Sequence, residues 1–231
     1  MPNFFLRGLI IGLSIAAPVG PIGILVIRRT LINGQLSGFI SGLGAATADA
    51  IYGSIAGLGL TLISSFLIKQ QMWLGLIGGI FLCYLGLKTL LTITSSPIKA
   101  ITYSESKNPE SERKYASIAA IHSNHLSRDY LADYGSTLFL TLTNPMTILS
   151  FTAIFAGLGL TSNNGNLMLA FSLIAGVFVG STIWWLCLSS FANFFRLRAF
   201  NSNSFLWINR ISGLIILGFG LVAIILALKD S

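Results

Sequence analysis

Long apolar runs separated by short polar stretches dominate this sequence. A helix needs about 20 apolar residues to cross the hydrocarbon core of a bilayer. Three runs of sufficient length occupy the first half of the chain, at residues 8–27, 36–68 and 70–91. The uncharged run 134–195 is too long for one helix, and the turn residues at 161–166 divide it; a last run covers 211–228. The pattern predicts an all-α integral membrane protein with six transmembrane helices.

One polar stretch, residues 95–133, separates the first three runs from the last three. We therefore expect three parts: a first three-helix repeat at 1–94, a polar cytoplasmic loop at 95–133 and a second three-helix repeat at 134–231. An odd number of spans per repeat inverts one half relative to the other. The opening span of each half carries proline near its middle, and inverted repeats with broken helices are typical of transporters that bind their solute near the midplane.

The composition excludes a soluble domain and changes how the charge is interpreted. Of the residues, 54% are hydrophobic and 9% are charged, where a soluble domain carries about 25%. The net charge of +7 comes from Lys and Arg between the apolar runs, which favours membrane orientation over nucleic-acid binding. Most of these residues fall in loops 1, 3 and 5, so these loops are expected in the cytoplasm and both termini outside. Glycines at four-residue spacing permit close helix packing and a homodimer.

The first candidate site lies midway along the first span. Pro18 and Pro21 lack an N–H group and flank Gly20, so backbone carbonyls near Ser14 and Ala17 lose their helical partners. In lipid these groups must be satisfied by protein, water or solute. The functional interpretation is a broken helix that lines a solute cavity; the alternative is a kink that serves packing.

Asp49 is the one acidic residue deep in an apolar run. A charged side chain at the centre of a span costs at least about 2.5 kcal/mol, so it needs a compensating role. Asp49 is predicted to bind a solute ammonium group or to carry a coupling proton. Tyr52, on the same helical face, is expected to donate a hydrogen bond to it. The alternative is a structural acid bonded to a neighbouring helix.

A second polar cluster interrupts the fourth span. Pro145 frees a carbonyl near Thr141, and Thr143 and Asn144 offer hydrogen-bond donors and acceptors. The cluster suits the zwitterionic head of an amino acid, or else hydrogen bonds between helices. Arg28, at the end of the first span, either attracts a carboxylate or sets orientation together with Arg29.

Other chemistry has little support in the sequence. Cys83 and Cys187 lie singly in apolar runs, and His122 and His125 lie in the polar loop without a cysteine cluster, so we expect no metal site. Neither a phosphate-binding Gly-rich loop with its Lys nor a nucleophile motif occurs in a suitable context. We therefore expect no cofactor and no enzymatic activity.

Several motifs in order along the chain give it a resemblance to a known family. They are Gly20-Pro21 followed by Arg28, the segment 42–49 that ends in Asp49, Gly78-Gly79 with 84–86, Asn144-Pro145, and 210–213 with Gly218 and Gly220. The sequence resembles the LysE-type translocators, which include the lysine, homoserine and threonine exporters. The resemblance covers most of the chain except 95–133.

Two positions depart from the family pattern. The family's first motif reads Pro-Gly-Pro-Asn, whereas this chain has Pro18-Val-Gly-Pro21 followed by Ile22, and the Lys that often follows Asn-Pro is Met146 here. Both departures remove polar groups near the expected site, so they bear on the solute more than on the family.

The resemblance implies a secondary transporter that exports an amino acid or related metabolite across a bacterial inner membrane, driven by a proton or ion gradient. Its partners would be the lipid bilayer, the solute and the coupling ion. Two alternatives stay open. A metal or inorganic-ion carrier would need more ligands than one Asp, and a membrane-embedded lipid enzyme would need an acid–base pair that the sequence does not offer.

Overall fold

A computed structural model describes residues 2–57, 66–91, 130–157, 167–199 and 202–229. All regular structure in these residues is helical. The helices are α1 (Pro2–Ala16), α2 (Pro21–Asn33), α3 (Gln35–Gly57), α5 (Gln71–Leu91), α7 (Pro145–Gly157), α8 (Leu167–Ala199) and α9 (Ser202–Lys229). Residues 66–69 and 130–142 are also helical.

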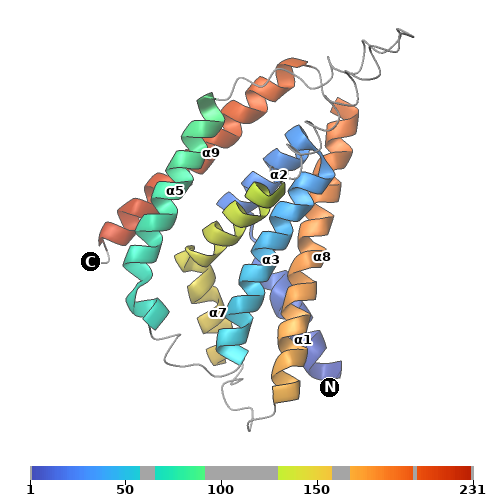
Figure 1. Cartoon of the computed structure of the whole chain (residues 1–231), viewed down its shortest axis with the longest axis vertical. Coiled ribbons are helices and arrows are strands. Elements are labelled where there is room, and N and C mark those ends of the chain that lie inside the picture. The colour runs from blue at the N-terminus through green and yellow to red at the C-terminus, as the bar shows by residue number, and fades with distance from the viewer. Residues whose placement is uncertain (1, 58–65, 92–129, 158–166, 200–201, 230–231) are drawn as a thin grey trace, which may run out of the picture.

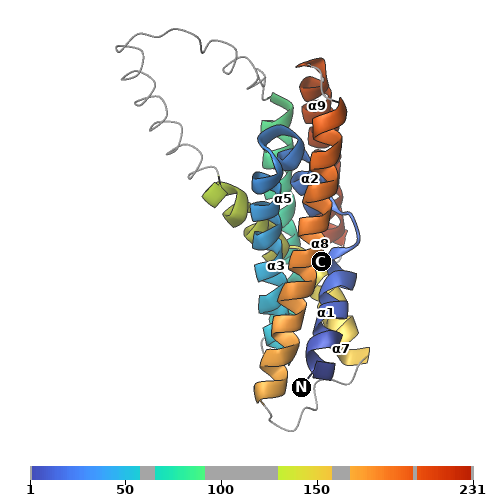
Figure 2. The same cartoon turned by 90° about the vertical axis from the view of Figure 1, so that its right-hand side faces the viewer.

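The long helix α8 runs most of the length of the molecule with α3 beside it, and the broken helices lie against these two (Figure 1). The helices α1 and α2 follow each other at different heights along α8, with the break between them (Figure 2). The second interrupted helix, 130–142 followed by α7, accompanies α3 in a similar way. One half of the molecule therefore contains α2 and 130–142, and the other half contains α1 and α7.

Close backbone approach fixes α1 against α8. A Cβ atom at Gly8 would meet the carbonyl oxygen of Leu173, and one at Gly12 would meet that of Val177. Gly176 and Gly180 of α8 lie equally close to the backbone of α1. Such contact is open only to residues without a side chain, and it replaces the hydrophobic driving force that lipid does not supply between helices.

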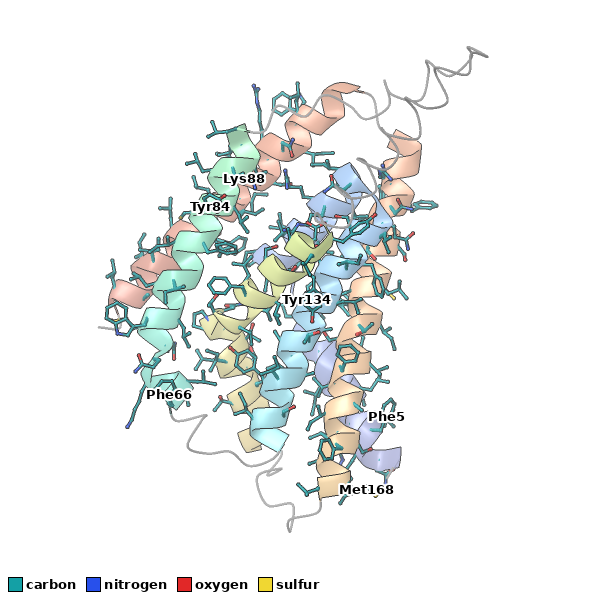
Figure 3. All side chains as sticks on the ribbon, in the orientation of Figure 1. Phe5, Phe66, Tyr84, Lys88, Tyr134 and Met168 are labelled. Atoms are coloured by element: carbon teal, nitrogen blue, oxygen red, sulfur yellow. The ribbon has the colours of Figure 1, made fainter. Side chains whose placement is uncertain are left out.

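The helices α5 and α9 form an antiparallel pair along one edge (Figure 1). A Cβ atom on Gly79 would lie 3.0 Å from the carbonyl oxygen of Gly220, and one on Gly86 would lie 3.0 Å from that of Gly213. Two glycine pairs seven residues apart thus bring both backbones together. The opposite face of α5 exposes large apolar side chains at regular spacing, including Trp73, Ile77, Ile80, Tyr84 and Leu87 (Tyr84 is labelled in Figure 3).

Three described helices are long and apolar enough to cross a membrane: Gln71–Leu91, Leu167–Arg196 and Leu206–Lys229. A fourth span results if α1 and α2, bent by 82°, count as one. These correspond to the predicted third, fifth, sixth and first spans. The predicted second span corresponds to α3, which carries Asp49, and the fourth is divided by the break before α7. The helical membrane architecture agrees with the sequence, while the count of six and the inverted repeat stay predictions.

Two boundaries differ from those expected. Arg28 and Arg29, expected in the first loop, lie inside α2, which continues to Asn33. Gly34 alone joins α2 to α3, at a positive φ of 102° that favours glycine, and its N–H donates to the Thr30 carbonyl at 3.0 Å. Residues 130–133, expected in the polar loop, are helical. The rest of that loop, with His122 and His125, lies outside the described residues.

Candidate functional site

The first break leaves helix ends without their usual partners. The last helical bond of α1 runs from Ala17 N–H to the Leu13 carbonyl at 3.0 Å, and Pro18 has no N–H with which to continue. Gly20 then donates to the Pro18 carbonyl at 2.9 Å, and α2 begins at Pro21. The prolines thus produce the broken helix that the sequence predicts, with an angle of 82° between its halves.

The start of α2 is uncapped. Gly20 stands at the N-cap position and makes no side-chain cap hydrogen bond, because it has no side chain. The N–H groups of Ile22 and Gly23 belong to the first turn and have no intrahelical acceptor. Ile22 and Gly23 are buried. The N-terminus of α2 is therefore a cluster of backbone donors, with the positive end of a helix dipole, at the break.

The second break satisfies its own groups. Pro145 cannot donate to the Thr141 carbonyl, which instead accepts the Asn144 N–H at 3.3 Å. The Asn144 side chain accepts the N–H of Met146 at 3.1 Å, as an N-cap does. The Leu142 carbonyl, which an unbroken helix would pair with Met146, accepts the Tyr52 hydroxyl at 2.5 Å. The Thr141 and Leu142 carbonyls at the second break thus both have a partner within the protein.

These contacts change the roles expected for two residues. The Tyr52 hydroxyl donates to the Leu142 carbonyl, not to Asp49, because the break offers it a backbone acceptor. Thr143 donates to the Phe139 carbonyl of its own helix at 2.9 Å and lies against Gly78 of α5. The polar cluster of the fourth span is therefore largely occupied by contacts within the protein.

Asp49 is buried where α3 meets α8. Its side chain on α3 is 3% exposed, and Ser181 of α8 donates to its Oδ2 at 2.6 Å. Trp185, one turn further along α8, donates its indole N–H to the Ser181 hydroxyl at 3.1 Å. Among the described residues, no donor bonds to the other oxygen, Oδ1. Asp49 is thus a buried carboxyl held on one oxygen by a neighbouring helix, with the second oxygen available.

Both breaks lie near the level of Asp49 along α3. On one side, Ala16 at the end of α1 shares a buried cluster with Ala45, Ala46 and Trp185. On the other side, Tyr52, three residues past Asp49, bonds to the second break and shares a separate cluster with Phe151 of α7. Asp49 therefore lies between two apolar clusters. The first cluster contacts the first break, and the second cluster contacts the second break.

A charged network that the sequence did not reveal lies beyond the first of these clusters. Arg29 of α2 forms an ion pair with Asp133 of helix 130–142, with 2.9 Å between Nε and Oδ1, and both side chains are buried. The four-residue spacing of Ser37 and Ser41 on α3 was the available signal, since both serines bond to this pair. Next to it, the Nε of Arg28 donates to the side-chain oxygen of Asn209 in α9 at 3.0 Å.

The described residues contain no group of three or more His, Cys, Asp or Glu side chains placed to hold a metal ion. The groups of the site that could contact a solute are the carboxyl of Asp49 and the backbone groups at the breaks.

Comparisons with known proteins agree with this architecture. The family model described as "LysE type translocator" matches residues 13–227. The chain is also similar to "Putative amino acid efflux protein YcgF" of Bacillus subtilis (strain 168), with 30% identity over 198 residues, which cover 84% of this chain and 82% of that protein. No solved structure matches. The match and the apolar helices indicate a multi-pass membrane transporter rather than an enzyme, and this chain belongs to the LysE-type translocator family.

Proposed function

We propose that this protein exports an amino acid or a closely related small metabolite across a bacterial inner membrane. The observation that carries the proposal is the buried Asp49 carboxyl beside two helix breaks, with one oxygen bonded to Ser181 and the other without a donor among the described residues. The efflux protein from Bacillus subtilis supports the solute class, through its name and its similarity over most of this chain.

The geometry favours a zwitterionic solute. Asp49 supplies a carboxylate oxygen for an ammonium group. The N-terminus of α2, without a side-chain cap, supplies N–H donors for a carboxylate. Both lie beside the cluster formed by Ala16, Ala45, Ala46 and neighbouring residues. Opposite charges on the solute thus meet complementary groups from two different elements.

The transport cycle follows from the same residues. Asp49 exchanges its proton for the solute ammonium, which couples export to a proton or ion gradient. Loops 1, 3 and 5 face the cytoplasm, so α2 ends toward the cytoplasm and the solute enters from that side. A homodimer is compatible with this scheme, because the site is built from one chain.

The test is transport by purified protein in vesicles. Vesicles are loaded with a mixture of amino acids, and a pH gradient is imposed in each direction. We expect movement of one or a few amino acids, faster in one direction of the gradient and slower when an ionophore collapses it. Folded protein that moves none of them under either gradient would contradict the proposed solute class, and divalent cations would then be tested.

A further inference from the structure

The Arg29–Asp133 pair joins one half of each broken helix. Arg29 belongs to α2, the second half of the first broken helix, and Asp133 belongs to 130–142, the first half of the second. The two half-helices are joined here by charge, whereas the other half-helices, α1 and α7, share an apolar cluster that includes Ile11 and Phe151.

Both charged groups of the pair make further hydrogen bonds to neighbouring residues. The Arg29 guanidinium donates to Ser41 at 2.9 Å, to the Asp133 carbonyl at 2.8 Å and to Ser136 at 2.7 Å, besides its bond to the Asp133 carboxylate. The Ser37 hydroxyl donates to the second carboxylate oxygen. Three elements thus meet around two charges that are 7% exposed each.

The pair lies on one side of the candidate site. Arg29 is about 12 Å along α2 from Pro21, and Asp133 is about 14 Å along its helix from Leu142, at 1.5 Å per residue. Arg29 and Asp133 both lie toward the N-terminal end of α3, because they bond to Ser41 and Ser37, which precede Asp49. The network therefore closes the end of the molecule at which α2 ends, and the Tyr52–Phe151 cluster closes the other.

Stability alone does not account for a buried ion pair. Removing two charges from water costs several kcal/mol per ion, and apolar replacements of a buried pair are often neutral or stabilising. In a membrane-spanning region ionisable groups are costly and mark functional positions. An ionic contact also has two distinct states, joined and separated, whereas the other end is closed by apolar packing and the neutral hydrogen bond of Tyr52.

We propose that Arg29 and Asp133 are a positioning pair that holds α2 against helix 130–142 and separates when this end of the site opens. The inference rests on the transport function proposed above and assigns the pair to one step of the cycle. Ser41 of α3 accepts from Arg29 and Ser37 of α3 donates to Asp133, so each charge has a hydrogen-bond partner outside the pair.

The experiment measures access to a buried position behind the pair. Ala45 of α3 is 0% exposed and lies one turn from Ser41 toward Asp49. Ala45→Cys is made with Cys83→Ala and Cys187→Ala, which remove the native thiols. A membrane-impermeant maleimide is then added to one side of the vesicles at a time, and the rate of labelling is measured with and without Asp133→Asn.

We expect Asp133→Asn to raise the labelling rate on the order of tenfold when the maleimide is added on the side of the membrane at which α2 ends. Addition on the other side should leave the rate unchanged. Arg29→Asp combined with Asp133→Arg restores opposite charges and returns the rate toward the starting value. The matched control is Gln35→Ala, which removes a neutral hydrogen bond to Ser190 of α8, 2.9 Å long, at the same end of α3. It should leave the rate unchanged.

Unchanged labelling in folded Asp133→Asn protein would overturn the inference. So would an equal increase from both sides, or the same increase in Gln35→Ala, because each would indicate general loosening. If Asp133→Asn does not fold, Arg29→Gln removes the same ion pair from its other side, and an unchanged rate there overturns the inference equally. Labelling requires no solute, so its result is independent of whether amino acids are transported.

Discussion

Both helix breaks are followed by a helix that begins at a proline, but the starts of these two helices are capped differently. Each second half-helix begins at a proline, Pro21 in α2 and Pro145 in α7. Before Pro145, Asn144 caps its helix with its side chain, and Tyr52 takes up the freed carbonyl. Before Pro21, Gly20 makes no side-chain cap. The second break is thus capped within the protein, whereas the first leaves its cap position open, as the proposed solute site requires.

The largest effect on transport is expected from a substitution that gives the first break a side-chain cap like that of the second. Gly20→Asn places a capping side chain at the start of α2, where a Cβ atom meets nothing within 4 Å and φ is −93°. The new side chain competes with a solute carboxylate for the N–H groups of Ile22 and Gly23. We expect the KM for transport to rise at least about tenfold while the protein stays folded.

The matched control for that substitution is Gly135→Asn. Gly135 lies in helix 130–142, and an added Cβ atom there also meets nothing within 4 Å. Its KM should stay near that of the unchanged protein. An equal rise in both variants, or no rise in Gly20→Asn, would break the distinction between the two breaks.

The second largest effect is expected at Tyr52. Tyr52→Phe keeps the ring beside Phe151, 5.8 Å between centroids, and removes the hydroxyl that serves the Leu142 carbonyl. An unsatisfied buried acceptor costs about 1–3 kcal/mol, so thermal stability in detergent should fall while the KM changes little. A large KM increase without loss of stability would instead indicate that Tyr52 contacts the solute.

The smallest effect is expected at the cap of the second break. Asn144→Ala removes the acceptor for the Met146 N–H and should cost about 1 kcal/mol of stability, as the loss of a helix cap does. Transport by the remaining folded protein should be nearly unchanged, which a comparison of initial rates per folded molecule measures. Abolished transport at normal stability would restore the zwitterion-binding role predicted for Asn144 from sequence.

Local chemistry explains which features the sequence predicts well. The break at Pro18 and Pro21 and the break at Pro145 follow from the missing proline N–H, which acts on the neighbouring turn alone. Apolar run length likewise places α5, α8 and α9 as spans. Asp49 stands out because an acid in an apolar run is costly wherever its partner lies.

Features that depend on distant pairing are not visible in the sequence. Ser181 is 132 positions from Asp49, and Asp133 lies 104 positions from Arg29, at the edge of a run of charged residues that looks like an ordinary loop. The Tyr52 contact was predicted from three-residue spacing on one helix. The Leu142 carbonyl, released by a break in another helix, determines the actual partner.

The central claim is that Asp49 binds the solute ammonium between the breaks, and the most direct measurement compares Asp49→Asn with Ser54→Ala in the same vesicles. Ser54 lies on the same helix and donates to the Ala50 carbonyl at 2.7 Å, so its removal is the matched control. Transport of the identified amino acid should be lost in folded Asp49→Asn and retained in Ser54→Ala. Undiminished transport by Asp49→Asn would contradict the account and make Asp49 a structural acid bonded to Ser181.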